Sequence, residues 1–428
     1  MAEVPKLPRA WVTRRRLRVH GLILALCLWC TYAWVMATPG LRDRNGIVKG
    51  ADFLHFYTLG TLASEHRGDV LYDMPAQAEI TQQRVPGVGR VLFVPLYPPQ
   101  VSLIFVPFAA LPYAWALLCW ASLSAVLYGL CCRLIWKTCG DLQRDGRLVL
   151  LLALAYPAFF HVIAWGQTSV LALACFVLTF LALHSGRPFA AGLAIGCLIF
   201  KPQLGLAAAF VFVLSGEWRI VSGALVSSTL QLLVGWMYYG TAVLRDYWHH
   251  LKNVSAVMTQ FEPRPYQMHS LRAFWTMLLP WPRLAFALSL ASALAVLFGG
   301  LVCWRRGGSL GVRFSVLLLA TVLVSPHLTV YDLVILAPIF LLLGDVASAD
   351  DALGKKVGLL LYLCFVLPLI GPLSIWTHVQ LSVPVMVALL WVIYREPTST
   401  GQDPSTGSGQ AARRSTISAG FEAIPGRT

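Results

Sequence analysis

The sequence predicts an all-α, polytopic integral membrane protein, and three observations lead to that fold class. Of the 428 residues, 57% are hydrophobic and only 12% are charged, and the mean hydropathy is +0.69. Soluble domains of ordinary composition do not reach these values. Apolar segments recur from residue 21 to residue 394, and a helix of roughly 20 apolar residues crosses a bilayer. Because these runs are continuous rather than alternating, they exclude a transmembrane β-barrel.

About twelve transmembrane helices are expected, within a range of roughly 10–13. An even number places both termini on the same side of the membrane. Residues 98–111, bounded by Pro98, Pro99 and Pro112, are expected to form a half-depth re-entrant segment, and 270–282 a second one. The expected spans cover 21–38, 113–136, 148–164, 168–184, 188–201, 203–216, 218–239, 283–304, 312–325, 328–344, 357–371 and 379–394.

The distribution of positive charge predicts that both termini are cytosolic. With that orientation most of the 33 Lys and Arg residues fall on the cytosolic side, as the positive-inside rule requires. The formal charge of +14 therefore indicates no nucleic-acid partner. The expected organisation is a basic cytosolic N-terminus (1–20), one membrane domain (21–396) with exterior loops at about 39–112 and 240–282, and a disordered cytosolic tail (397–428).

Asp52 is the most informative acidic residue, because it follows the first span in the segment Gly50-Ala-Asp-Phe-Leu-His-Phe-Tyr57. With a cytosolic N-terminus, its carboxylate lies at the outer membrane face. An acid placed there among aromatic rings is suited to deprotonate a hydroxyl group beside a lipid-borne substrate. The alternative is an ordinary loop or helix-capping acid.

Polar residues at the span ends collect mainly on the predicted outer face, whereas the mid-plane of the bilayer carries almost no titratable group. Ionisable groups within a membrane are energetically costly and are therefore commonly functional. The residues of this set are Asp52, His55, Tyr57, Tyr72, Asp73, Tyr97, His161, Gln167, Lys201, Gln203, His269, His327, Tyr331 and Asp332.

Lys201 and Asp332 most need an explanation. Lys201 is followed by Pro202, which interrupts the helix. Its ammonium could extend to the lipid head-groups or bind a phosphate. Asp332 could be a purely structural partner of Lys201 or His327, or a second carboxylate of the site that orients a base or a sugar hydroxyl.

Structural alternatives also remain open for three other residues. His327 follows Pro326 at a helix start and could simply be a hydrogen-bonded helix-end histidine. Gln167 closes the turn Ala164-Trp-Gly-Gln167 and could act only within it. Tyr97 precedes two prolines and could serve the architecture of the re-entrant segment.

Several short motifs, taken in order, resemble glycosyltransferase family 87, polytopic enzymes similar to polyprenyl-phosphate-mannose-dependent mannosyltransferases. The likeness runs from about residue 50 to about residue 345. The motifs are Ala51-Asp-Phe53 with Tyr57, Gly68 with Leu71-Tyr-Asp73, Tyr97-Pro-Pro99 with Pro107 and Leu111-Pro112, Gly166-Gln167, Ala191-Gly192 with Lys201-Pro-Gln203, Trp218-Arg219, Ser325-Pro-His327 and Tyr331-Asp-Leu333.

This resemblance implies a GT-C architecture, in which a helical membrane domain opens its active site to the exterior. Asp52 matches the family's catalytic acid in the first exterior loop, and His327 matches the histidine near the donor phosphate. The second exterior loop carries Gln267-Met-His-Ser270 in place of the usual Asn-Gln-Ser-like stretch, which leaves the acceptor open.

The expected activity is transfer of a hexose, with mannose as the first candidate, from a polyprenyl-phosphate sugar to a hydroxyl of a lipid or glycan acceptor. The reaction would invert the anomeric carbon at the extracytoplasmic face of a bacterial plasma (inner) membrane. Asp52 is the expected base. Lys201 and His327, with His55 in reserve, are the expected phosphate ligands. The expected sugar or acceptor contacts are Tyr57, Tyr72, Tyr97, Gln167, Gln203, His269, Tyr331 and Asp332.

No Gly-rich nucleotide loop is found in the sequence, in line with a lipid-linked donor as co-substrate. No metal site and no cofactor are expected. Two other classes of protein remain as alternatives. One is a transporter or flippase of lipid-linked sugars, which would need a path through the bilayer centre. The other is a non-catalytic subunit of an envelope-assembly complex.

Overall fold

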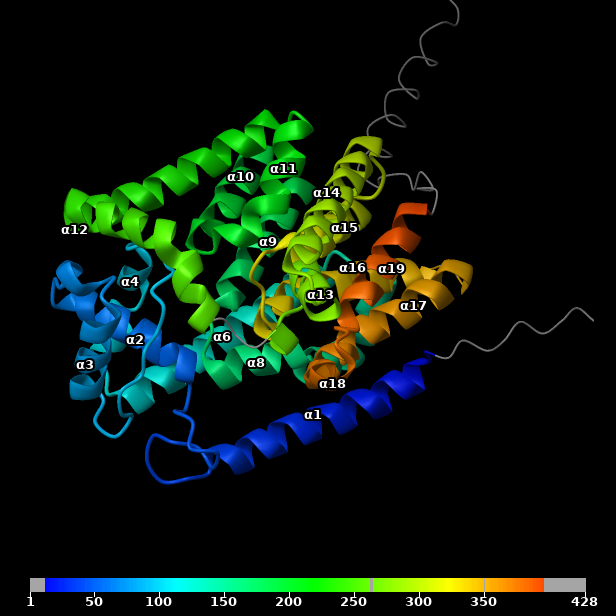
Figure 1. Ribbon diagram of the computed structural model, residues 1–428. Helices are drawn as coiled ribbons and strands as arrows, with labels where there is room; N and C mark the ends of the chain where they lie inside the picture. Colours follow the sequence, from blue (N-terminus) through cyan, green and yellow to red (C-terminus); the bar gives the residue numbers. More distant parts are fainter. Residues whose placement is uncertain (1–11, 262–264, 350, 396–428) are drawn as a thin grey trace, which may run out of the picture.

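The computed structural model describes residues 12–261, 265–349 and 351–395 (Figure 1). Across these ranges the chain is helical and contains no β-strand; only two isolated bridges occur, between Arg42 and Val48 and between Met268 and Thr329. The predicted all-α polytopic class is confirmed. The expected disordered tail, 397–428, lies outside the described residues.

The α-helices fall into three groups along the chain. The first group is α1 (Arg14–Met36), α2 (Ala51–Ser64), α3 (Met74–Arg84), α4 (Val101–Ile104), α5 (Val106–Ala109), α6 (Tyr113–Trp136) and α7 (Gly146–Ala155). The second is α8 (Pro157–Trp165), α9 (Ser169–His184), α10 (Pro188–Gly196), α11 (Leu206–Leu214) and α12 (Trp218–Phe261). The third is α13 (Leu271–Leu278), α14 (Pro282–Arg306), α15 (Leu310–Val324), α16 (Ala337–Ala349), α17 (Asp351–Val366), α18 (Ser374–Thr377) and α19 (Ser382–Arg395).

Short 3₁₀ helices connect or extend these elements. They are η1 (Gly68–Val70), η2 (Asp141–Asp145), η3 (Cys197–Phe200), η4 (Pro202–Gly205), η5 (Pro265–Gln267), η6 (Val330–Leu336) and η7 (Leu367–Leu373).

The helix lengths leave the expected number of about twelve spans unconfirmed. Six described helices are long and apolar enough to cross a membrane, or seven if the bent pair formed by 141–155 and 157–165 counts as one span. The other apolar helices have 10–17 residues, and roughly 20 are needed for a straight crossing. Local breaks explain the shortening, because Gly166, Pro202 and Pro326 each end or interrupt a continuous apolar run.

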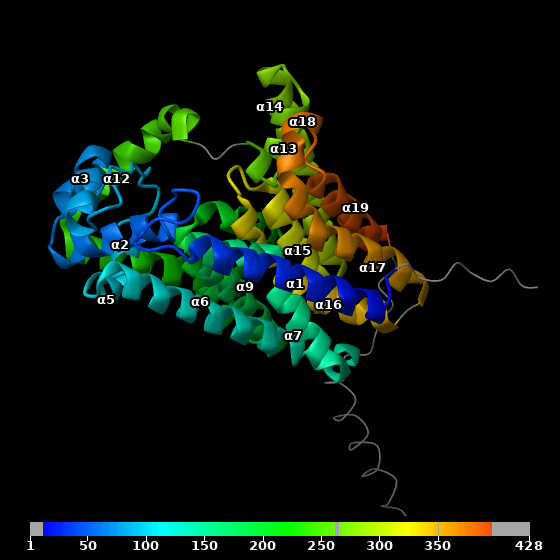
Figure 2. The ribbon, with the colours of Figure 1, turned by 90° about the horizontal axis from the view of Figure 1, so that it is seen from below.

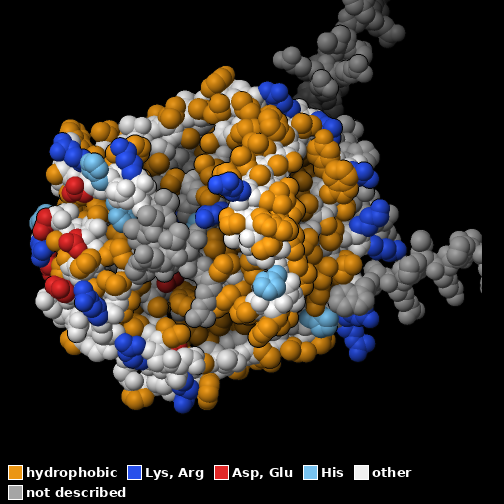
Figure 3. All heavy atoms as spheres, in the orientation of Figure 1, with side chains coloured by type: hydrophobic (Ala, Val, Ile, Leu, Met, Phe, Trp, Pro, Cys, Tyr) orange, Lys and Arg blue, Asp and Glu red, His pale blue; other side chains and the backbone are white. Residues whose placement is uncertain are grey.

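The face of the molecule in Figure 3 is hollowed near its middle. In Figure 1, α2 and α3 form one lobe beneath α12, while α13–α19 occupy the opposite side. Figure 3 shows a hollow between these two sides, with acidic side-chain atoms visible inside it. Helix α12 bends between its two arms at Gly240, whose backbone angles (φ 78°, ψ −178°) are not helical.

Helix α1 lies along the outside of the bundle (Figure 2). It packs chiefly against α7, and Gly21 is its only buried residue. The expected re-entrant segment 98–111 contains two four-residue helices, α4 and α5, that pack against α2. The second expected re-entrant stretch, 270–282, contains α13. Their depth in a bilayer stays a prediction.

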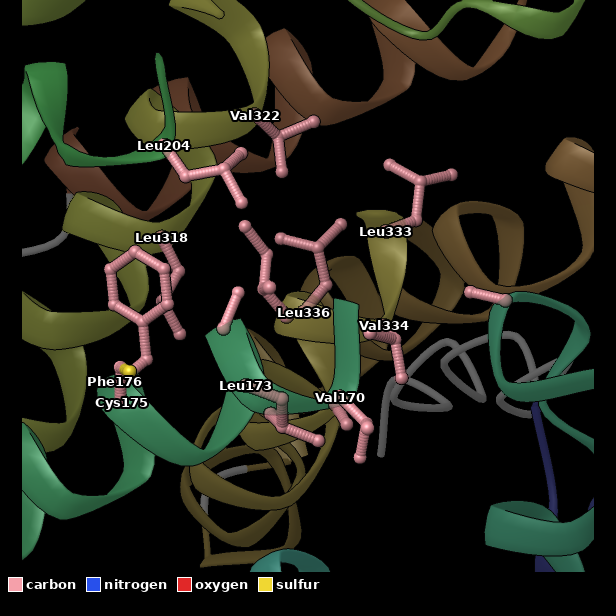
Figure 4. Close-up of a cluster of buried hydrophobic side chains, with 14 of the residues drawn as sticks. Val170, Leu173, Cys175, Phe176, Leu204, Leu318, Val322, Leu333, Val334 and Leu336 are labelled. Atoms are coloured by element: carbon pink, nitrogen blue, oxygen red, sulfur yellow. The ribbon is translucent and has the colours of Figure 1, made fainter. Parts of the chain in front are cut away.

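A core of buried apolar side chains lies next to the polar residues described below. In Figure 4 it contains Val170, Leu173 and Phe176 of α9, together with side chains of η4, α15 and η6. Leu204 and Leu333 of this cluster are buried almost completely and follow closely on Lys201 and Asp332 in the sequence. Close packing of this kind leaves little room for backbone movement, so the core fixes the polar residues beside it.

Candidate active site

Asp52 lies in the first turn of α2, and contacts around the start of this helix fix its position. The Tyr113 hydroxyl donates to the carbonyl oxygens of Lys49 (2.7 Å) and Gly50 (3.0 Å). Phe53, the next residue, is fully buried and its ring stacks on Trp120. Asp52 itself is half-buried. Its carboxylate is therefore held by a rigid helix start and remains partly accessible.

Gln167 binds the Asp52 carboxylate directly. Its Nε2 donates to Asp52 Oδ2 at 2.6 Å, while its Oε1 accepts from the backbone N–H of Thr168 at 3.2 Å. The second contact fixes which end of the amide faces the acid. Asp52 and Gln167, more than a hundred positions apart in the sequence, thus meet where the turn between α8 and α9 contacts the start of α2.

Gly166 creates the corner that places Gln167. Its φ of 72° is in the left-handed region, which favours glycine. A Cβ on this residue would lie 2.5 Å from Phe53 Cβ, and its carbonyl accepts from Trp120 Nε1 at 3.0 Å. The corner therefore packs against the helix that carries Asp52.

Substitution of Gly166 by alanine is expected to separate Gln167 from Asp52. Left-handed strain and overlap with Phe53 together should lower the free energy of unfolding by about 2–5 kcal/mol. Gly186→Ala is a matched control, because Gly186 also has a positive φ, 68°, but a Cβ there meets nothing within 4 Å. Thermal unfolding in detergent compares the two variants. Equal destabilisation of both would contradict the proposed packing of the corner.

Lys201 and Asp332 form a buried ion pair. Lys201 Nζ lies 2.8 Å from Asp332 Oδ1, and the two side chains are only 5% and 4% exposed. Ser169 joins them, since its Oγ donates to Asp332 Oδ1 (2.6 Å) and accepts from Lys201 Nζ (3.0 Å). Thr329 donates to Asp332 Oδ2 from its hydroxyl (3.3 Å) and from its backbone N–H (3.4 Å). Of the alternatives for Asp332, pairing with Lys201 is the one observed.

The local sequence explains why both charges sit at helix breaks. Lys201 (φ −133°, ψ 68°) separates η3 from η4, because Pro202 lacks an N–H and disfavours helical angles in the preceding residue. Asp332 is the third residue of η6 and forms a capping box with Thr329. Each break turns a polar side chain toward the turn that carries Gln167 and Ser169.

The surroundings of Asp52 raise the pKa of its carboxyl group toward neutral pH, chiefly through burial. Burial raises the pKa of Asp52 to about 6; the Gln167 hydrogen bond and the Lys201 charge oppose this rise, and the Asp332 charge adds to it. The carboxylate is therefore mostly ionised at neutral pH. A base with a pKa just below the working pH accepts a proton efficiently in a transition state.

His55 lies one helical turn from Asp52 but carries no charge at neutral pH. Burial lowers the pKa of His55 to about 4. Its ring lies 5.0 Å from that of Phe93 and 6.2 Å from that of Tyr97, and neither ring nitrogen has a hydrogen-bond partner among the described residues. A neutral imidazole can donate to a phosphate but cannot supply a positive charge to it.

The tyrosines expected at the site separate into two groups. The Tyr331 ring lies 5.4 Å from Lys201 Nζ, and Tyr97 is close enough for the Lys201 charge to act against the burial that raises the pKa of its hydroxyl. The Tyr72 hydroxyl donates to the Tyr97 carbonyl at 3.1 Å, and its ring packs against Tyr247 and His250. The Tyr57 hydroxyl donates to the Leu111 carbonyl at 2.8 Å. Tyr97 and Tyr331 thus adjoin the charged cluster, whereas Tyr57 is used in packing.

Three further expected residues lie on segments around the cluster. Gln203 is half-buried in η4, two residues after Lys201. His327 is half-buried in the turn before η6, two residues before Thr329, and Ser325 donates to its carbonyl. His269 is buried and its Nδ1 pairs with Ser382 Oγ at 2.8 Å. That bond directs the His269 ring toward α19.

Ser169 and Thr329 complete the cluster and were not singled out in the sequence. Hydroxyl residues are common in membrane helices, where they usually bond to the carbonyl four residues earlier. Only the position of Ser169, two residues after Gln167, hints at its role. Within the described part of the chain, no three His, Cys, Asp or Glu side chains lie close enough together to hold a metal ion.

Comparison with known families agrees with the sequence motifs. The model of glycosyltransferase family 87 matches residues 96–326, more than half of the chain. This range includes Gln167, Ser169 and Lys201, while Asp52 and Asp332 lie on either side of it. A search of curated proteins found no match, and neither did a search of solved structures. The expected family is confirmed by the extent of the match, and the chain belongs to glycosyltransferase family 87.

Proposed function

We propose that the protein transfers a hexose, with mannose as the first candidate, from a polyprenyl-phosphate sugar to a hydroxyl group of a lipid or glycan acceptor. The family supports sugar transfer, and the long apolar helices support a membrane location. One observation carries the choice of base: the half-buried Asp52 carboxylate accepts a hydrogen bond from Gln167 and lies within reach of the Lys201 charge. The reaction takes place at the extracytoplasmic face of a bacterial plasma membrane, with both termini in the cytosol.

The proposed step is a single displacement. Asp52 takes the proton of the acceptor hydroxyl while that oxygen attacks the anomeric carbon from the side opposite the phosphate. The new bond joins the acceptor oxygen to the anomeric carbon. The bond from that carbon to the phosphate oxygen breaks, and its electron pair leaves with the polyprenyl phosphate. One carboxylate suffices because the phosphate is a good leaving group, and the anomeric configuration is inverted.

Lys201 and His327 are the proposed ligands of the departing phosphate, with His55 as a neutral donor in reserve. A lysine ammonium has three N–H donors, and the Ser169 and Asp332 contacts of Lys201 use two of them. The third N–H remains for the donor phosphate, where a cation in a low-dielectric site stabilises developing negative charge strongly. Asp332 then acts as a positioning residue for Lys201.

The remaining polar groups around the cluster are proposed to bind the sugar or the acceptor. Gln167 orients Asp52, while Tyr97, Tyr331 and Gln203 border the same cluster and can contact sugar hydroxyls. His269 belongs to the second exterior loop, where the sequence departs from the family pattern, and its proposed role concerns the acceptor.

The pH dependence of kcat/KM tests the environment of Asp52. The base must be deprotonated, so the rate should fall as the pH drops below about 6, by about tenfold per pH unit well below that value. Gln167→Leu removes the hydrogen bond that lowers the pKa of Asp52. The acidic limb of its profile should therefore move to higher pH. An unchanged limb, or one moved to lower pH, would remove Asp52 as the titrating base.

A donor panel tests the proposed function as a whole. Protein purified in detergent is incubated with labelled mannose, glucose or arabinose on polyprenyl phosphate and, separately, on a nucleotide. Products extracted from the mixture are identified by mass spectrometry. We expect transfer from a lipid-linked donor only. Transfer from a nucleotide sugar, or none from any lipid-linked donor when extracts of lipid and glycan acceptors are present, would overturn the proposal.

A further inference from the structure

A large cavity lies between part of α1 and the helices beside it. Its volume is about 690 Å³, within the range of about 300–1,000 Å³ typical of ligand pockets. The other walls come chiefly from α7, α16 and α17, with further residues of α6 and η2. None of Asp52, Gln167, Lys201 and Asp332 lines it. The cavity is therefore separate from the candidate active site.

One face of α1 borders the cavity. The lining residues of this helix are Arg14, Leu17, His20, Gly21, Ile23, Leu24 and Cys27, and most of them follow helical spacing along one stripe. Only 6% of the most apolar stretch of α1 is buried. The His20–Tyr362 hydrogen bond (2.9 Å) joins α1 to α17 across the space. An apolar stripe facing an apolar cavity leaves room for a hydrocarbon chain.

The cavity is basic at the end where α1 begins. Arg14 and Lys355 line it there, and Asp145 is the one acidic residue among the described residues of the lining. Asp145 is shared by two arginines, because Arg14 lies 3.1 Å and Arg18 4.0 Å from its carboxylate. Lys355 is exposed and forms no ion pair with the described residues. The positive charge at this end is thus only partly neutralised.

We propose that this cavity binds an anionic phospholipid from the leaflet at the basic end of α1, with an acyl chain between α1 and α17 and the phosphate at Arg14 and Lys355. Basic pockets between membrane helices on the cytosolic side commonly bind such head-groups. The 23 residues of α1 span about 35 Å, and Asp52 follows its opposite end. A phosphate held at Arg14 therefore cannot belong to the sugar donor at Asp52.

The position of the site suggests what the lipid does. Tyr156 lines the cavity, and its hydroxyl donates to the carbonyl of Leu333 at 2.6 Å. Leu333 is the neighbour of Asp332, and Tyr156 directly precedes α8, which ends at the Gly166 corner. A lipid chain packed against Tyr156 would therefore stabilise the positions of Leu333 and of the start of α8. Occupancy should therefore stabilise the fold, whatever reaction the protein catalyses.

Native mass spectrometry of the delipidated protein tests the site with three probes: dioleoylphosphatidylglycerol, dioleoylphosphatidylethanolamine and polyprenyl phosphate. We expect preferential binding of one phosphatidylglycerol, with a rise in melting temperature. Arg14→Gln combined with Lys355→Gln should weaken that binding by about thirtyfold. No preference for phosphatidylglycerol, or its displacement by polyprenyl phosphate, would overturn the proposal.

A filled cavity provides the second test. Gly358 lines the cavity and a Cβ there meets nothing within 4 Å, so Gly358→Phe should place a ring in the lipid's position and abolish binding. Gly299→Phe is the matched control, because Gly299 is also helical and open but lies in α14, outside the cavity. Binding by Gly358→Phe equal to that of the wild type would rule out this location. If Gly358→Phe does not fold, the exposed Arg14 and Lys355 variant still decides.

Discussion

Replacement of Asp52 by asparagine is expected to lower the rate of sugar transfer by about 10²–10⁴-fold, the usual contribution of a general base. Asparagine keeps the size of the side chain but cannot accept the acceptor's proton. Its amide can still contact Gln167, which donates to Asp52 in the native protein. Donor binding and the melting temperature should therefore change little. Single-turnover transfer from a labelled polyprenyl-phosphate sugar measures the effect.

Asp69→Asn is the matched control for this experiment. Asp69 is also an acid of the first predicted exterior loop, but its side chain is 67% exposed and pairs only with Arg67. Its substitution should leave transfer unchanged. If Asp52→Asn retained wild-type transfer, or if both variants lost it equally, Asp52 would not be the base.

Breaking the buried ion pair between Lys201 and Asp332 should strongly lower the free energy of unfolding. Lys201→Met leaves Asp332 charged and almost inaccessible to solvent, and removal of one partner of a buried pair typically costs about 3–5 kcal/mol. The free energy of unfolding in detergent should fall by about that amount. Arg67→Met, which breaks an exposed pair, should lower it by only about 0–1 kcal/mol.

A double variant separates the structural role of Lys201 from a role in catalysis. Adding Asp332→Asn to Lys201→Met removes the unpaired charge and keeps one acceptor oxygen for either Thr329 or Ser169, so much of the stability should return. If the ammonium also stabilises the departing phosphate, transfer stays low in the refolded double variant. Recovery of both stability and transfer would show that the pair is structural only.

The sequence predicts the fold class well because hydrophobicity is a property of each segment alone. Composition and segment length suffice for a polytopic helical protein, whereas the number of full spans depends on where helices break. The breaks at Gly166 and Pro202 are visible in the sequence, and the apolar helices beside them have only 10–17 residues. The number of spans, about twelve, therefore stays a prediction, while the helical membrane class is confirmed.

The candidate site could be predicted residue by residue but not as a set of contacts. Asp52 and Lys201 stand out because a charge in an apolar chain needs an explanation. The sequence left open whether Asp332 would pair with Lys201 or with His327, and the Lys201 pair is the one present. Ser169 carries no such signal. Its role depends on a distance between α9 and η6 that no spacing rule encodes.

The anomeric configuration of the product tests the proposed mechanism most directly. A single displacement assisted by one carboxylate must invert the configuration at the anomeric carbon. Product made by the wild-type protein from a polyprenyl-phosphate sugar of known configuration can be assigned by NMR. Inversion, together with loss of product in Asp52→Asn, is the expected result. A retained configuration would require a covalent intermediate on a second nucleophile and would contradict Asp52 as the base of a direct transfer.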